Sequence, residues 1–110
     1  MTWQLEGFDT TPLATAISLI MQERFRQCEK GYDSDHDQEH EGFELVFAAT
    51  SIAERSVGIE YDKPDILAMA NHSWPWEGDM PKHVSPMRDL IIAASLLVAE
   101  IERRLVADGN

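Results

Sequence analysis

Residues 85–107 read SPMRDLIIAASLLVAEIERRLVA and decide the fold of this chain. Ser85 followed by Pro86 is typical of a helix start, because serine caps the first turn and proline suits the first helical position. Apolar residues then recur every three or four positions, which predicts an amphipathic α-helix over residues 86–107. The residues expected to face inward are Leu90, Ala93, Ala94, Leu97, Val98, Ile101 and Leu105.

A first helix is predicted over residues 12–30. Thr10-Thr11-Pro12 supplies an N-cap and a proline in the first turn, and Gly31 is the kind of residue that commonly ends a helix. The inward stripe of this helix begins as apolar and then becomes polar. It comprises Leu13, Ala16, Ile17, Ile20 and Met21, followed by Arg24, Gln27 and Cys28.

Two more helices are expected in the middle of the chain. Residues 41–56 carry apolar residues at helical spacing, and Gly58 is expected to end that helix. Its inward residues are Leu45, Ala48, Ala49 and Ile52, with Phe43 and Phe47 widening the apolar face. Residues 64–71 form a shorter helix that begins at Pro64, and the stretch after it is expected to be irregular.

These helices predict an all-α fold. A chain of 110 residues with 44% apolar content has the size of one domain with one core. We therefore expect a single domain over residues 1–110, with residues 1–10 as an N-terminal arm. The domain is a small bundle of three to four helices, with an irregular Trp/Pro-rich loop before the last one.

The chain is strongly acidic, with a net charge of -11 from 20 acidic and 9 basic residues. This charge repels nucleic-acid backbones and anionic membranes, so neither is expected as a direct partner. The same charge favours a basic protein surface as a partner, but many acidic proteins use their charge for solubility alone, and both interpretations stay open. The single cysteine, Cys28, excludes an internal disulfide and suits a reducing, cytoplasmic environment. The sequence does not decide whether the chain is a monomer or forms a homo-oligomer.

Polar residues on the inward stripes indicate a candidate site. Arg24 and Gln27 extend the stripe of the first helix, while Glu44 and Asp89 border the stripes of two others. Antiparallel packing is expected to bring Arg24, Glu44 and Asp89 into one partly buried cluster. Buried charges are retained when they are paired, so the cluster is either a structural salt bridge or a ligand site.

Acidic residues and histidines mark two further positions that could carry chemistry. Glu41 and Glu44 stand three residues apart at the start of a predicted helix, and this spacing places them on one face. His36 and His40 lie in the acidic segment YDSDHDQEH, residues 32–40, whose nitrogen and oxygen donors suit a divalent metal. A solvated loop explains the same two histidines, and the sequence leaves both interpretations open.

The tryptophan pair Trp74-Pro75-Trp76 places two large aromatic rings around a rigid residue. Such rings either close the open side of a bundle or stack on a planar ligand.

Several segments together resemble a family of small phage and prophage proteins. They are Glu23-Arg24-Phe25-Arg26-Gln27, Gly31-Tyr32, Asp35 to His40, Gly42-Phe43-Glu44-Leu45 with Ala48-Ala49, Trp74-Pro75-Trp76, Arg88-Asp89-Leu90 and Ala99 to Arg103. The resemblance covers nearly everything after residue 20 and implies a bacteriophage accessory protein. Together with the inward polar positions and the tryptophan pair, these segments give seven candidate ligand-binding residues. They are Arg24, Gln27, Glu44, Trp74, Trp76, Arg88 and Asp89.

The helix around Arg24 and the acidic helix after it are also similar to the MazG-type all-α nucleotide pyrophosphohydrolases. Those enzymes hold magnesium with an ExxE pair and a later ExxD pair. Glu41 and Glu44 match the first pair, but Pro86 replaces the glutamate of the second and leaves only Asp89. The resemblance implies a magnesium site at Glu41, Glu44 and Asp89, and the missing carboxylate argues against hydrolysis.

We therefore expect a non-catalytic phage accessory protein that counters host defence. It would sequester a nucleotide-type ligand or block a basic surface of a host protein. The alternatives are a magnesium-dependent, MazG-like nucleotide pyrophosphohydrolase and a structural phage protein.

Overall fold

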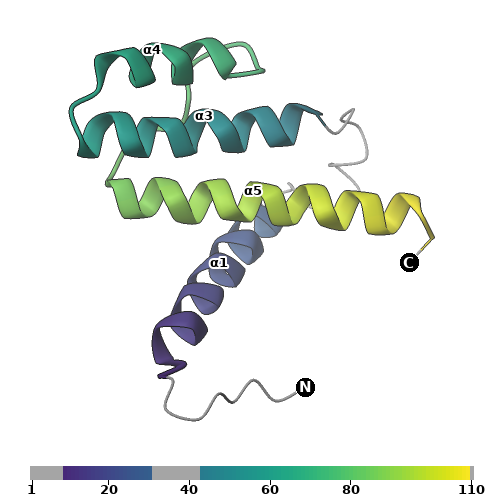
Figure 1. Ribbon diagram of the computed structural model, residues 1–110. Coiled ribbons are helices and arrows are strands. Elements are labelled where there is room, and N and C mark those ends of the chain that lie inside the picture. Colours follow the sequence, from purple (N-terminus) through teal and green to yellow (C-terminus); the bar gives the residue numbers. More distant parts are fainter. Residues whose placement is uncertain (1–8, 31–42, 110) are drawn as a thin grey trace.

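The computed structural model describes residues 9–30 and 43–109, and these residues form an all-α bundle, as predicted (Figure 1). Within those ranges there are four helices and no strand. The helices are α1 (Thr11–Glu29), α3 (Phe43–Glu60), α4 (Pro64–Ser73) and α5 (Pro86–Ala107). No helix in these ranges is both long and apolar enough to cross a membrane.

The predicted helix starts are confirmed in part. The Ser85 hydroxyl accepts a hydrogen bond from the Arg88 backbone N–H at 3.0 Å, so this serine caps α5 as expected. Thr10 occupies the N-cap position of α1, but its side chain makes no capping bond. The Asp9 carboxylate caps the helix instead, because it accepts a hydrogen bond from the Thr11 backbone N–H at 2.9 Å. Gly31, the expected end of α1, lies outside the described residues.

Gly58 was expected to end its helix, and this expectation is wrong. Gly58 is buried inside α3, which continues to Glu60. A Cβ atom at this position would lie 2.7 Å from the Cγ atom of Leu67 on α4. The glycine therefore allows α4 to approach α3 closely, and the chain reverses instead at Asp62, whose φ of 50° is in the left-handed region.

α3 lies between α4 and α5, and α1 packs mainly on α5 (Figure 1). The centre of the core is small, with Ala49, Ile52 and Ala93 buried between α3 and α5. Partly buried apolar side chains surround this centre, among them Trp74, Ile92 and Leu96. The alanines allow close approach of the two helices that position the candidate site.

The expected inward stripe of α5 needs a correction. Of its seven residues only Ala93 is buried, whereas Leu90, Leu97, Ile101 and Leu105 are each about half exposed. α5 is apolar on more than one face, and α3 covers the face that carries Ala93. Phe43 and Phe47 on α3 are likewise about half exposed, and they contact each other edge to face.

Candidate functional site

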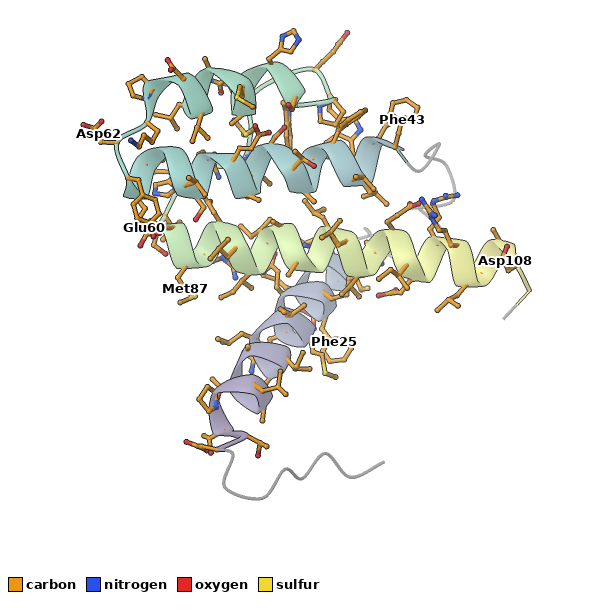
Figure 2. The ribbon with its side chains drawn as sticks, in the orientation of Figure 1. Phe25, Phe43, Glu60, Asp62, Met87 and Asp108 are labelled. Carbon is orange, nitrogen blue, oxygen red and sulfur yellow. The ribbon has the colours of Figure 1, made fainter. Side chains whose placement is uncertain are left out.

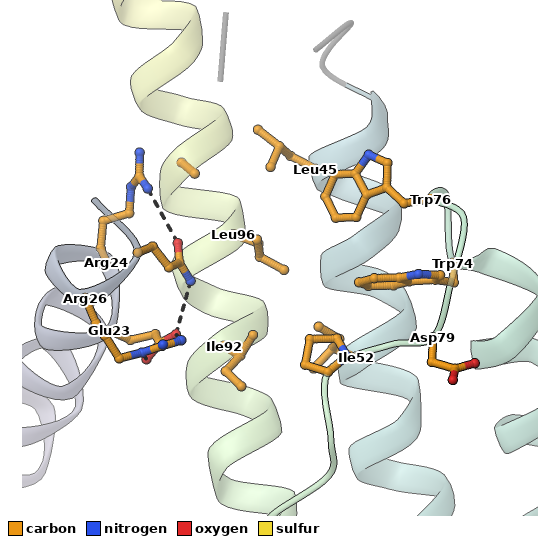
Figure 3. Close-up of a pocket in the computed structure, with 13 residues that line it drawn as sticks. Glu23, Arg24, Arg26, Leu45, Ile52, Trp74, Trp76, Asp79, Ile92 and Leu96 are labelled. Carbon is orange, nitrogen blue, oxygen red and sulfur yellow. Dashed lines mark hydrogen bonds and ion pairs between the residues drawn. The ribbon is translucent and has the colours of Figure 1, made fainter. Parts of the chain in front are cut away.

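A cavity of about 460 Å³ lies where the C-terminal end of α1, α3, α5 and the Trp loop meet (Figure 3). We define the Trp loop as residues 74–85, which join α4 to α5. One wall of this central cavity is polar and comes from α1, and the facing wall is made by the two tryptophans. Its lining includes Glu23, Arg24, Arg26 and Gln27 on the polar wall, Trp74 and Trp76 on the aromatic wall, and Leu45, Ile52, Ile92 and Leu96 between them.

The polar wall is built around the buried carboxylate of Glu23. Arg26 donates to it twice, from Nε at 2.8 Å and from Nη2 at 2.6 Å. Arg88 on α5 also donates to this carboxylate, so Glu23 joins α1 to α5. Gln27 donates from Nε2 to Glu23 at 3.3 Å and to the Ser95 hydroxyl at 2.8 Å. This network holds the amide of Gln27 in one orientation.

Arg24 forms the second pair that joins α1 to α5. Its Nε donates to Glu102 Oε1 at 2.9 Å, and its Nη2 donates to Glu102 Oε2 at 3.2 Å. Nη1 of Arg24 lies 3.5 Å from Gln27 Oε1, which connects the pair to the Glu23 network (Figure 3). These hydrogen bonds therefore hold the buried guanidinium of Arg24 in one position at the cavity wall.

The pKa of Glu23 is shifted by this environment. Burial alone raises the pKa, but hydrogen bonds from Arg26, Arg88 and Gln27 and the charge of Arg88 outweigh burial and lower it from 4.5 to about 2. In the folded protein the Glu23 carboxylate therefore stays ionised at pH values at which the same group in the unfolded chain already binds a proton. The stabilisation from Glu23 is complete above pH 4.5 and is lost as the pH falls from 4.5 towards 2.

Replacing Glu23 with glutamine is expected to remove this pH-dependent stabilisation. At neutral pH, Glu23→Gln should lower the free energy of unfolding by about 2 kcal/mol, because a buried carboxylate with two arginine partners is lost. The difference between parent and variant should shrink below pH 4.5 and approach zero near pH 2. Urea unfolding of both proteins across this range measures it, and a difference that does not change with pH would contradict the assignment.

The aromatic wall has a defined geometry. The rings of Trp74 and Trp76 are 5.2 Å apart at an interplanar angle of 86°, so the pair is edge to face. Trp76 donates from Nε1 to Glu44 Oε2 at 2.7 Å, which fixes the ring from α3. Trp74 Nε1 is buried and has no hydrogen-bond partner in the part of the chain that the structure describes. Because this atom has almost no accessible surface, it lies behind the cavity wall, and the tryptophan presents its ring to the cavity.

A second polar group anchors the Trp loop and the start of α5. The fully buried carboxylate of Asp89 accepts from Arg55 at 2.8 and 3.1 Å, and Asp89 Oδ2 lies 2.8 Å from His83 Nδ1. Arg55 also donates from Nη1 to the Pro81 carbonyl at 2.6 Å. This Arg55 cluster therefore ties α3, the Trp loop and α5 together at the end of the bundle.

The structure divides the predicted ligand-binding residues into groups. Arg24, Gln27, Trp74 and Trp76 line the central cavity. Glu44 borders it through Trp76, and Arg88 supports it through Glu23.

Asp89 does not join Arg24 and Glu44, so the single predicted cluster is wrong. α3 and α5 are antiparallel, which places Asp89 opposite Arg55, roughly 16 Å along α3 from Glu44. A magnesium site with Glu44 and Asp89 as ligands does not fit this arrangement. Glu41, His36 and His40 lie outside the described residues, and within the described ones no three His, Cys, Asp or Glu residues form a group suited to a metal ion.

Several functional residues were missed from the sequence although a signal was present. Glu23 stands three residues before Arg26 and four before Gln27, the spacings at which helical side chains meet. Arg55 continues the stripe of Ala48 and Ile52, and a charge on a buried stripe indicates a buried ion pair.

Comparisons of the chain with protein-family models, with curated proteins and with solved structures found no match.

Proposed function

We propose that this chain sequesters a small nucleotide-type ligand in the central cavity without converting it. The observation that carries this proposal is the facing pair of walls, one made of two tryptophans and the other of fixed polar groups. A volume of about 460 Å³ is within the range of small-molecule sites, which combine apolar walls with a few placed polar groups.

The aromatic wall suits a nucleobase. Stacking of a base on an aromatic side chain contributes about 1–3 kcal/mol and tolerates every base, because each has a π-face. Glu44 restrains Trp76, so less freedom is lost when a ring stacks on it.

The polar wall suits the sugar and phosphate end of the ligand. Arg26 uses Nε and Nη2 for Glu23, and its Nη1 takes no part in that pair. The Arg26 side chain is also partly exposed, so it can reach an oxygen at the rim of the cavity. Because the chain as a whole is acidic, we expect few phosphates on the preferred ligand.

The same contacts favour binding over hydrolysis. The carboxylates of Glu23 and Asp89 are each held by arginine, and Glu44 accepts from Trp76. A carboxylate engaged in this way is a poor magnesium ligand or general base, since its oxygens already accept strong hydrogen bonds. Sequestration of a nucleotide signal would suit a phage accessory protein that counters host defence, the context that we propose for it. The alternative, blockage of a basic host surface, rests on the acidity and makes no use of the cavity.

The proposal is tested by native mass spectrometry and equilibrium dialysis. The set of ligands comprises ribonucleosides, their 5′-monophosphates and triphosphates, and cyclic nucleotides, with and without Mg²⁺. We expect one ligand per chain and recovery of that ligand unchanged after incubation with Mg²⁺. Conversion of a nucleotide near the typical enzymatic rate of about 10 per second would support the pyrophosphohydrolase instead, and binding of no member of the set would contradict sequestration.

A further inference from the structure

α1 is attached to the bundle in a different way from the other long helices. The structure describes all 19 residues of α1, and the only buried ones are the charged residues Glu23 and Arg24. The partly buried residues of this helix are Ile20, Gln27 and Cys28. α3 and α5, in contrast, bury apolar side chains against each other and form the core. Buried charges rather than a buried apolar stripe therefore hold α1 in place.

The apolar packing between α1 and α5 is loose. A groove of about 600 Å³, whose lining includes Leu19 and Leu90, runs between the two helices. A second groove of about 300 Å³ lies on the other side of the crossing, and its lining includes Phe25 and Val98. Phe25 points outward from α1 and is 59% exposed (Figure 2). Because apolar stabilisation scales with the area removed from water, these grooves leave the interface with little of it.

Three side-chain pairs join α1 to α5, and we call them the α1 latch. They are Glu23 with Arg88, Arg24 with Glu102 at 2.9 Å, and Gln27 with Ser95 at 2.8 Å. The α1 members of the latch span residues 23–27, little more than one helical turn, and the N-terminal half of α1 extends away from α5 (Figure 1). A helix held by polar contacts at one place can be released while the apolar core stays closed.

We propose that α1 opens and closes as one unit while α3, α4 and α5 stay folded, with the α1 latch holding the closed state. Closed α1 supplies the polar wall of the central cavity, and opening removes that wall. The consequence for ligand binding rests on the function proposed above. A nucleotide that contacts both walls binds the closed state better, so it shifts α1 towards that state.

Hydrogen exchange of the ligand-free parent tests the opening directly. A detached helix of this length is only marginally stable, so its amides exchange when α1 opens. After correction for intrinsic rates, residues 23–29 should exchange at least about a hundredfold faster than residues 49–56 at the centre of α3. Their exchange should also depend only weakly on urea, because opening α1 exposes little buried apolar surface.

Arg88→Met tests the latch. The variant removes one tie between the helices, while Glu23 keeps the two hydrogen bonds from Arg26 on its own helix. Exchange of residues 23–29 should become at least about tenfold faster, and exchange of residues 49–56 should not change. Glu102→Gln cuts a second tie and should act in the same direction, so the test does not depend on one variant.

Arg104→Met is the matched control for Arg88→Met. It also removes an arginine of α5 that contacts a carboxylate, but this carboxylate belongs to Glu100 on the same helix. The control therefore changes no contact of the latch, and residues 23–29 should exchange as they do in the parent.

Two results with the ligand-free protein would overturn the proposal. One is exchange of residues 23–29 at the same rate and with the same urea dependence as residues 49–56, because α1 would then open only when the core unfolds. The other is an equal acceleration of both regions by Arg88→Met.

These results do not depend on a ligand, so a failure to bind any nucleotide counts against the proposed function alone. With a nucleotide that binds in dialysis, exchange of residues 23–29 should become slower. Saturated binding that leaves this exchange unchanged would overturn the link between α1 and the cavity.

Discussion

Replacing Arg55 with methionine is expected to lower the free energy of unfolding by about 3–5 kcal/mol. Arg55 supplies the guanidinium that faces the carboxylate of Asp89, and Asp89 has no exposed surface. Methionine fills a similar volume but leaves that carboxylate buried without its counter-charge. Among the described residues His83 then still contacts the carboxylate, and a single ring nitrogen does not replace two guanidinium hydrogen bonds.

Urea unfolding at neutral pH measures this effect, and two variants control it. Arg104→Met removes an arginine that is also 2.7 Å from a carboxylate, but this side chain is mostly exposed, so the cost should be about 0.5 kcal/mol. The double variant Arg55→Met with Asp89→Leu removes both charges and should recover most of the loss. A cost below about 1 kcal/mol for Arg55→Met alone would show that the Arg55 cluster does not stabilise the end of the bundle.

The second large effect is expected on ligand affinity. Trp76→Leu should weaken binding of the preferred nucleotide by about tenfold to hundredfold, because one stacked aromatic ring contributes about 1–3 kcal/mol. Trp76→Phe keeps a ring and should retain most of the affinity. Tyr61→Leu is the matched control, since it also replaces an aromatic residue with leucine but lies exposed beyond the end of α3. Equilibrium dialysis compares these variants, and equal affinities for Trp76→Leu and the parent would remove Trp76 from the site.

The helices could be predicted because their signals are local. Ser85, Pro86 and the apolar spacing after them are enough to place α5, and the same reasoning placed the other three helices to within a few residues. Gly58 shows the limit of local reasoning. A glycine that ends a helix and a glycine that allows a neighbouring helix to approach look the same in sequence, and only the packing of Leu67 separates them.

The candidate site could be predicted only in part, because it depends on the register between helices. Arg24, Gln27 and the tryptophans were identified as polar or aromatic exceptions on their elements. The partner of each charge was not, since pairing depends on how far antiparallel helices slide along each other. Asp89 therefore pairs with Arg55 rather than with Arg24, and Arg24 pairs with Glu102.

The central claim is that a nucleotide-type ring lies against the tryptophan wall, and indole N–H signals in ¹H–¹⁵N NMR test it most directly. The chain has three tryptophans, so a Trp3→Phe variant leaves only the signals of Trp74 and Trp76. Titration with the nucleotide that binds best in dialysis should shift both signals, with the same midpoint as the binding curve. Binding that saturates while both indole signals stay in place would contradict the account.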